Sequence, residues 1–245
     1  MDGATVPSEL IGCWRRAWIR FADGTYDDTT QVIWLQLDSR MADIRIPASR
    51  PDLSRRGGFD DCSLDELRQL ADSDSSSGIT RCTDIVTDAD GVRRATAEWF
   101  TRGIGINFQP VSVFPEPGLL EWNDDGNVLI ERAPSGAYVE EWHLMPGTCG
   151  PSGHRVLDDG RELYRAGEVA VVVRDRAVPV PRLARLEALV LECGDDRAAI
   201  EALIDCEFSF IERIAGRGDR GTDETHVVTM STLPWRQGDV VDVDL

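Results

Sequence analysis

The chain has 245 residues, with 26 arginines, no lysine and 44 acidic residues, so its formal net charge is −18 at pH 7. The absence of lysine excludes a Schiff-base lysine, a P-loop lysine and a Ser-Lys pair. The negative charge argues against nucleic acid and anionic membrane surfaces as partners, and no apolar run is long enough to span a bilayer. Because 42% of the residues are hydrophobic, we expect a packed globular protein of one large domain or two smaller ones.

The N-terminus, the cysteines and the histidines limit the compartment and the cofactors. Residues 1–9 lack the basic and apolar regions of a signal peptide, which predicts a cytoplasmic protein. The six cysteines form no C-x-x-C pair, and the three histidines have no metal-binding spacing. We therefore expect buried thiols, no bound metal and no other cofactor.

Apolar and polar residues alternate with a period of two through most of the first 150 residues, which predicts short β-strands. Turns such as Asp124-Asp125-Gly126 separate them, since glycine adopts positive φ at little cost. The predicted strands are residues 11–21, 30–37, 41–46, 78–88, 93–102, 104–110, 118–123, 127–132 and 137–145. So many antiparallel strands in succession indicate a barrel or sandwich, and closure would remove the exposed sheet edges.

One helix interrupts this β-rich part of the chain. Ser63 and Glu66 have the spacing of a capping box, and Leu64, Leu67 and Leu70 follow along one helical face. We expect this helix to cover or flank the barrel.

Residues 146–153 contain three glycines and two prolines, which is typical of a linker. They divide the chain into a first domain at 1–147 and a second at 154–245. Strands of the second domain are expected at residues 155–164, 168–174, 207–214, 226–231 and 240–243.

A helical hairpin is predicted as an insertion at residues 181–206 of the second domain. Leu186, Leu189 and Val190 share one face of its first helix, and Gly194 ends that helix. Asp195 or Asp196 would then cap a second helix that carries three apolar residues, Ile200, Leu203 and Ile204.

Gly12-Cys13-Trp14, at the start of the first predicted strand, is the G-x-W sequence with which lipocalins and other calycin barrels open. The other segments that carry the resemblance are residues 32–37, 42–47, 106–110, 138–142 and 233–238. In this order they resemble an uncharacterised bacterial family, related to fungal casein-kinase-interacting proteins, whose fold is two calycin-like (lipocalin-like) β-barrels in tandem. The resemblance implies an all-β fold of two such barrels, with residues 181–206 as a departure from the pattern, and it implies no catalytic residues.

Alternation along the first strand places Trp14, Arg16 and Trp18 on one face. If Trp14 points into the barrel, as the resemblance implies, Arg16 and Trp18 point into it as well. A buried guanidinium needs an anion, so Arg16 would meet the carboxylate of a ligand that lies between Trp18 and Trp34. The alternative is an ion pair within the fold, with Glu98, Glu121 or Glu140 as the partner.

The next two strands place Trp34 and Gln36 on one face and Arg45 between two isoleucines. Broad apolar walls with a few polar groups are typical of small-molecule cavities, although these side chains could equally face solvent or the helix. The candidate ligand-binding residues are therefore Arg16, Trp18, Trp34, Gln36 and Arg45.

Three Glu-Trp pairs recur, Glu98-Trp99, Glu121-Trp122 and Glu141-Trp142, and alternation predicts the indoles on one side of the sheet and the carboxylates on the other. Their spacing defines no paired-carboxylate catalytic site.

The favoured function is non-catalytic binding of a small hydrophobic or aromatic molecule in the first barrel, with a negative charge allowed by the arginines. One alternative is an acidic module that docks a basic protein partner. The other is a small-molecule isomerase or lyase with Glu140 or Glu98 as its base. An isolated cavity carboxylate with a raised pKa would favour chemistry, and a fully paired one would not.

Overall fold

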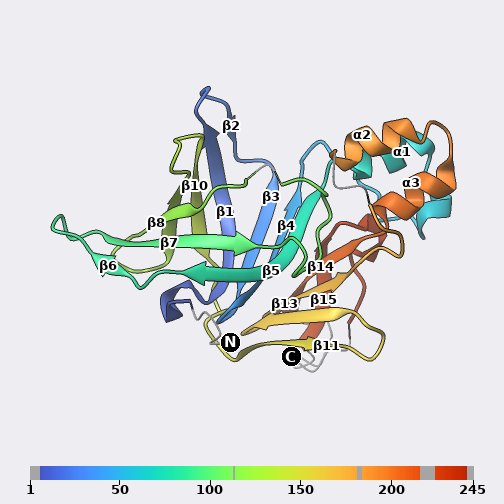
Figure 1. Ribbon diagram of the computed structural model, residues 1–245. Helices are drawn as coiled ribbons and strands as arrows, with labels where there is room; N and C mark the ends of the chain where they lie inside the picture. The colour runs from blue at the N-terminus through green and yellow to red at the C-terminus, as the bar shows by residue number, and fades with distance from the viewer. Residues whose placement is uncertain (1–5, 113, 181–183, 216–223, 242–245) are drawn as a thin grey trace.

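The computed structural model describes residues 6–112, 114–180, 184–215 and 224–241 (Figure 1). This part of the chain is β-rich, with two antiparallel sheets and three α-helices. Residues 181–183 of the predicted insertion and 242–243 of the predicted final strand lie outside the described residues.

Eight strands of the first sheet form a closed antiparallel barrel. They are β1 (Gly12–Phe21), β3 (Gln31–Gln36), β4 (Arg40–Ile46), β5 (Asp74–Cys82), β7 (Arg93–Phe100), β8 (Gly118–Trp122), β9 (Val128–Arg132) and β10 (Tyr138–Leu144). Their order is β10-β9-β8-β7-β5-β4-β3-β1, and β1 also pairs with β10, which closes the ring. The predicted antiparallel barrel is confirmed. The short strands β2 (Tyr26–Asp27) and β6 (Val86–Thr87) pair with β1 and β7.

Residues 104–110 are not a strand, contrary to the prediction. Only Asn107 forms an isolated bridge there, with Ser76 of β5. The chain from Thr101 to Pro117 instead crosses from β7 to β8 as a long connection without a named helix or strand among its described residues. In this connection Phe108 is fully buried, Ile106 is half-buried and Ile104 is exposed, so the apolar alternation of residues 104–108 does not mark one buried face of a strand.

The start of β1 explains the G-x-W sequence. Gly12 has a φ of +149°, and a Cβ at this position would lie 2.7 Å from Cδ1 of Leu144. Trp14 is fully buried, and its Nε1 donates a hydrogen bond of 2.9 Å to the carbonyl of Leu10 in the 3-10 turn η1 (Ser8–Leu10). Glycine therefore lets the chain bend while the indole closes this part of the barrel.

The second sheet is antiparallel and open among the described residues. Its strands are β11 (Ser152–Val156), β12 (Glu162–Ala166), β13 (Val169–Arg174), β14 (Glu207–Ala215) and β15 (Glu224–Ser231). They pair in chain order, and no pairing joins β15 to β11. The predicted second barrel is therefore not confirmed. The strand predicted at residues 155–164 is in fact a hairpin, because the chain turns between β11 and β12.

The barrel and the second sheet share a hydrophobic core. Ile33, Leu35 and Ile44 on the outer side of β3 and β4 belong to the same buried cluster as Val171 and Phe210 of the second sheet. Burial of each such side chain stabilises the fold by about 1.5–3 kcal/mol. This contact explains why β3 is buried along nearly its whole length on both faces.

Three short helices pack together at one end of the molecule, as Figure 1 shows. They are α1 (Leu64–Leu70), α2 (Leu186–Glu192) and α3 (Arg197–Ile204). The capping box of α1 is present, and Asp196 caps α3 by accepting a hydrogen bond from the backbone N–H of Ala199. The predicted helix and helical hairpin are confirmed, and α1 packs on that hairpin. Within the described ranges no helix has the length and apolar character needed to cross a membrane.

Candidate functional site

The interior of the barrel contains a small cavity of about 80 Å³ with an aromatic wall. The centre of the Trp34 ring lies 5.6 Å from that of Trp99 and 5.7 Å from that of Trp142, both edge-to-face. Phe114 and Tyr138 form a second edge-to-face pair at 5.1 Å. These edge-to-face arrangements are the ones that aromatic quadrupoles prefer, so the rings of the wall stabilise one another.

Two arginines inside the barrel are fully engaged in ion pairs. Arg16 reaches Oε1 of Glu140 at 2.9 Å and Oδ2 of Asp27 at 3.1 Å. Arg45 reaches Oδ1 of Asp43 at 2.9 Å and the same Glu140 oxygen at 3.4 Å. Arg16 thus forms the internal pair that the sequence allowed as the alternative, with Glu140 as its partner. Both guanidiniums already have anions, so neither is left for the carboxylate of a ligand.

Glu131 is the carboxyl group of the cavity wall that lacks an arginine. It is 4% exposed, and no guanidinium in the described residues forms an ion pair with it. It accepts one hydrogen bond, of 3.1 Å, from Oη of Tyr138. Burial, together with the negative charge of Glu140, raises the pKa of Glu131 to about 8. The group therefore holds a proton at neutral pH.

Asp74 and Asp43 complete the acidic wall. Burial raises the pKa of Asp74 to about 6, although the charges of Arg45 and Arg185 oppose this shift. Nη1 of Arg185 lies 3.6 Å from Oδ2 of Asp74. Burial also raises the pKa of Asp43, although the charge of Arg45 opposes this shift. Asp74 is thus ionised at neutral pH with only a loose partner.

A larger hollow of about 390 Å³ continues from the cavity along the connection between β7 and β8. The two hollows share five wall residues, Asp74, Ser76, Trp99, Ser112 and Phe114. One group of a ligand can therefore lie in the inner cavity while the larger remainder of the same molecule lies in this outer groove.

Gly118 of β8 makes room for two of the wall residues. A Cβ at this position would lie 2.6 Å from Cη2 of Trp99 and 3.0 Å from Cγ of Glu131. Any larger residue would displace the indole or the carboxyl group, so the local sequence fixes where both lie.

The structure places the five predicted ligand-binding residues in four different positions. Trp34 and Arg45 line the cavity. Gln36 is fully buried behind it, where its Oε1 accepts a hydrogen bond of 3.1 Å from Nε1 of Trp34. Arg16 lies in the ion-pair network beside the cavity.

Trp18 does not line the cavity, and the cause is a β-bulge. The register of β1 against β10 shifts between Arg16 and Trp18, so the alternation that predicted an inward Trp18 is broken. Trp18 is half-buried and stacks on the exposed Tyr26 at 6.0 Å. Ile19, which is 1% exposed, packs in the interior instead, against Tyr138.

Several wall residues were not predicted. Glu131 could have been found, because Leu129 and Glu131 alternate inward along β9. The Glu-Trp pairs carry a second signal: Trp122 and Trp142 are buried, as alternation predicts. Phe114 belongs to an irregular connection, where no periodicity reveals which way a side chain points.

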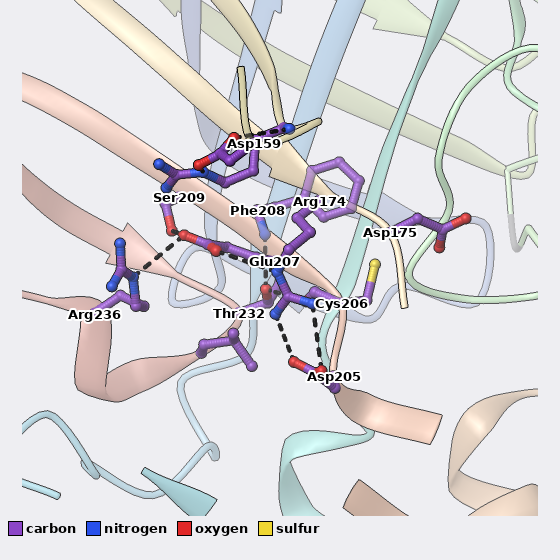
Figure 2. A network of polar contacts seen from close by, with 12 residues as sticks. Asp159, Arg174, Asp175, Asp205, Cys206, Glu207, Phe208, Ser209, Thr232 and Arg236 are labelled. Carbon is purple, nitrogen blue, oxygen red and sulfur yellow. Dashed lines mark hydrogen bonds and ion pairs between the residues drawn. The ribbon is translucent and has the colours of Figure 1, made fainter. Parts of the chain in front are cut away.

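A second charged cluster lies at the start of β14 (Figure 2). Glu207 accepts hydrogen bonds from Oγ of Ser209 at 2.8 Å and from Nε of Arg236 at 3.3 Å, and Arg174 pairs with Asp205 at 2.5 Å. A groove of about 420 Å³ runs beside it. Because each of these charges has a partner, the cluster fixes β14 against the 3-10 turn η3 (Pro234–Arg236) and leaves no group for a ligand.

The fold and the site define a closed antiparallel β-barrel with an aromatic and acidic cavity. No group of His, Cys, Asp and Glu in the described residues is arranged to hold a metal ion. Comparisons of the chain with protein-family models, curated proteins and solved structures found no match.

Proposed function

We propose that the barrel binds a small, partly apolar molecule, with one group in the inner cavity and its body in the outer groove. The observation that carries this proposal is the hollow of about 80 Å³ against three indole rings, continuous with one of about 390 Å³. An apolar cavity of about 150 Å³ is enough to bind benzene, and ligand pockets begin at about 300 Å³. The combined volume therefore suits a molecule of one or two rings.

Hydrogen bonds behind the aromatic wall favour a ligand-binding cavity over a packing defect in the core. Gln36 accepts hydrogen bonds from Nε1 of Trp34 at 3.1 Å and from Oγ1 of Thr80 at 2.7 Å, and its own Nε2 donates to the carbonyl of Leu37. A wall fixed in this way loses little conformational entropy when a ligand arrives.

We also infer that the barrel belongs to the calycin class. The bend at Gly12 and the burial of Trp14 beneath the turn η1 support this assignment. Calycin barrels carry ligands in the barrel, which agrees with the position of the cavity.

Phenethyl alcohol, a small aromatic alcohol, is a suitable first probe. We expect it to quench the tryptophan fluorescence of the wild-type protein in a saturable titration. Ser112 is exposed and lines both hollows, so Ser112→Trp should fill the passage and abolish binding without disturbing the core. Ser152→Trp, on the exposed strand β11, is the matched control and should bind as the wild type does. Equal quenching in both variants, or none in the wild type, would refute the proposal.

One observation supports a second function, general acid–base catalysis. Glu131 is a cavity carboxyl group without an ion pair among the described residues. Burial raises its pKa to about 8, close enough to neutral pH for the group to give up and take back a proton. Glu140 is less suited because two arginines hold its charge, and Glu98 is exposed. Deuterium incorporation from heavy water into a bound carbonyl compound would support catalysis if Glu131→Gln abolished it while the compound still bound.

A further inference from the structure

We propose that the natural ligand carries a protonated amine, which lies in the inner cavity between Glu131 and Asp74. This inference rests on the proposed function and names the chemical class of its ligand. It reverses the sign of charge that the arginines in the sequence suggested.

The carboxyl groups in and around the cavity outnumber the guanidiniums. Five carboxyl groups meet three guanidiniums in and around the cavity: Asp27, Asp43, Asp74, Glu131 and Glu140 against Arg16, Arg45 and Arg185. Even with Glu131 protonated, the interior has an excess of negative charge. A cation would lower the electrostatic free energy of this region, and an anion would raise it.

Both arginines inside the barrel, Arg16 and Arg45, already form ion pairs with carboxylates of the protein. A ligand carboxylate could reach Arg16 or Arg45 only by displacing Glu140, Asp27 or Asp43 from pairs of 2.9–3.4 Å. A displaced and buried carboxylate without a partner is strongly unfavourable. Glu131 and Asp74, in contrast, gain a closer partner when a cation enters. Among the described residues Glu131 forms no ion pair, and the ion pair of Asp74 with Arg185 is 3.6 Å long.

The aromatic rings of the cavity wall also favour a cation. The guanidinium of Arg45 lies 4.5 Å from the ring centre of Phe114 and 5.9 Å from that of Trp142, so these rings already stabilise one cation. Trp34 and Trp99 line the same cavity and have no cation over their faces among the described residues. Indole is the aromatic ring that attracts cations most strongly, and the attraction grows when the cation is desolvated.

The sizes of the two hollows define the arrangement of the ligand. The inner cavity of about 80 Å³ accepts an ammonium group with a short alkyl chain, and the groove of about 390 Å³ accepts an aromatic or aliphatic body. The inferred class is therefore a primary aryl-alkyl or alkyl amine.

The test uses three probes of the same shape: phenethylamine as the cation, phenethyl alcohol as the neutral form and hydrocinnamate as the anion. Binding to the full-length protein is measured by calorimetry at one near-neutral pH. We expect phenethylamine to bind at least about tenfold more tightly than the alcohol, and the alcohol more tightly than hydrocinnamate.

Variants identify the groups responsible. Glu131→Gln and Asp74→Asn should each reduce the advantage of the amine over the alcohol by about tenfold, while the alcohol keeps its affinity within about twofold. Glu121→Gln is the matched control, since Glu121 of β8 pairs outside the cavity with Arg132 at 3.1 Å. It should leave both affinities unchanged. Circular dichroism of each variant establishes that it is folded.

The possible failures are distinguishable. If the alcohol binds as tightly as the amine and Ser112→Trp blocks both, the amine inference is wrong and the binding function stands. If hydrocinnamate binds most tightly, the charge argument is wrong. If none of the three probes binds the wild-type protein, both the inference and the proposed function fail.

Discussion

Glu131 is a buried carboxyl group without an ion pair among the described residues. Buried carboxyl groups are normally paired with a cation, and the neighbouring Asp43 and Glu140 are. Glu131 has Tyr138 as its one hydrogen-bond partner, on a cavity wall. A group that costs stability and borders a hollow is more easily explained by a ligand than by folding.

The pKa of Glu131 predicts a pH dependence of stability. The charged groups around it are Glu140, Arg45 and Asp43, with Tyr138 as hydrogen-bond donor, and the net effect with burial is a pKa of about 8 against an ordinary value of 4.5. A raised carboxyl pKa means that the folded state holds the proton more tightly than the unfolded state. The contribution of Glu131 is therefore favourable at low pH and is lost as pH rises, by up to about 1.4 kcal/mol per pH unit between about pH 5 and pH 8.

Glu131→Gln removes this dependence while keeping the shape of the side chain. We expect urea unfolding to show the variant gaining stability relative to the wild type as pH rises from about 5 to about 8. A constant difference across that range would show that Glu131 is ionised in the folded protein.

The Arg16–Glu140 pair predicts a stability effect of a different kind. Arg16→Met leaves the buried Glu140 with Arg45 alone, at 3.4 Å, and should lower the free energy of unfolding by about 3–5 kcal/mol. Adding Glu140→Gln should restore part of this loss, because the orphaned charge is then removed. Arg20→Met, at an exposed position of the same strand, should change stability by less than about 1 kcal/mol. If the double variant is no more stable than Arg16→Met, the orphaned charge is not the cause.

At the scale of the elements, alternation predicted the barrel but not all of its interior. It correctly separated Trp34 and Gln36 from Ile33 and Leu35, since β3 is regular along its length. It failed after Arg16, because a bulge adds one residue to β1 and a bulge has no signature of its own in this sequence.

The rest of the site depends on contacts between distant segments. Phe114 enters the wall from an irregular connection, and Asp74 enters it from the first residue of β5. No local sequence pattern predicts that these two positions line the same cavity as Glu131 of β9. The paired Arg16 could be predicted as one of two alternatives, but only the pairing of β1 with β10 selects Glu140 as its partner.

Gln109 joins the helices to the barrel connection, and it gives a prediction at this scale. Its Nε2 donates to the carbonyls of Ala71 and Ser73 after α1, and its Oε1 accepts from the backbone N–H of Leu186 at the start of α2. Gln109→Leu would leave these three buried groups without a partner and should cost about 2–4 kcal/mol in thermal or urea unfolding. The exposed Gln69→Leu is the control, with a change below about 0.5 kcal/mol. Equal effects of the two changes would show that the three contacts do not stabilise the helices.

At the scale of the whole molecule, the barrel, the second sheet and the helices contribute to one hydrophobic cluster. Ile44 of β4, Phe210 of β14 and Leu67 of α1 are all fully or almost fully buried in it. A shared core couples the parts, so we expect a single cooperative transition in scanning calorimetry. Ile44→Ala and Phe210→Ala should each lower that one transition temperature. Two separate transitions, each sensitive to one of these changes, would show that the two sheets fold independently.

Binding of a small amine in the barrel cavity can be followed through the indole N–H signals of the seven tryptophans in two-dimensional proton–nitrogen NMR. During titration with phenethylamine, we expect large shifts for the three indoles of the cavity wall, Trp34, Trp99 and Trp142. Trp18, which stacks on Tyr26 away from the cavity, and Trp235, which packs on Phe59, should keep their positions. Shifts confined to Trp18 or Trp235, or no shift at saturating amine, would contradict it.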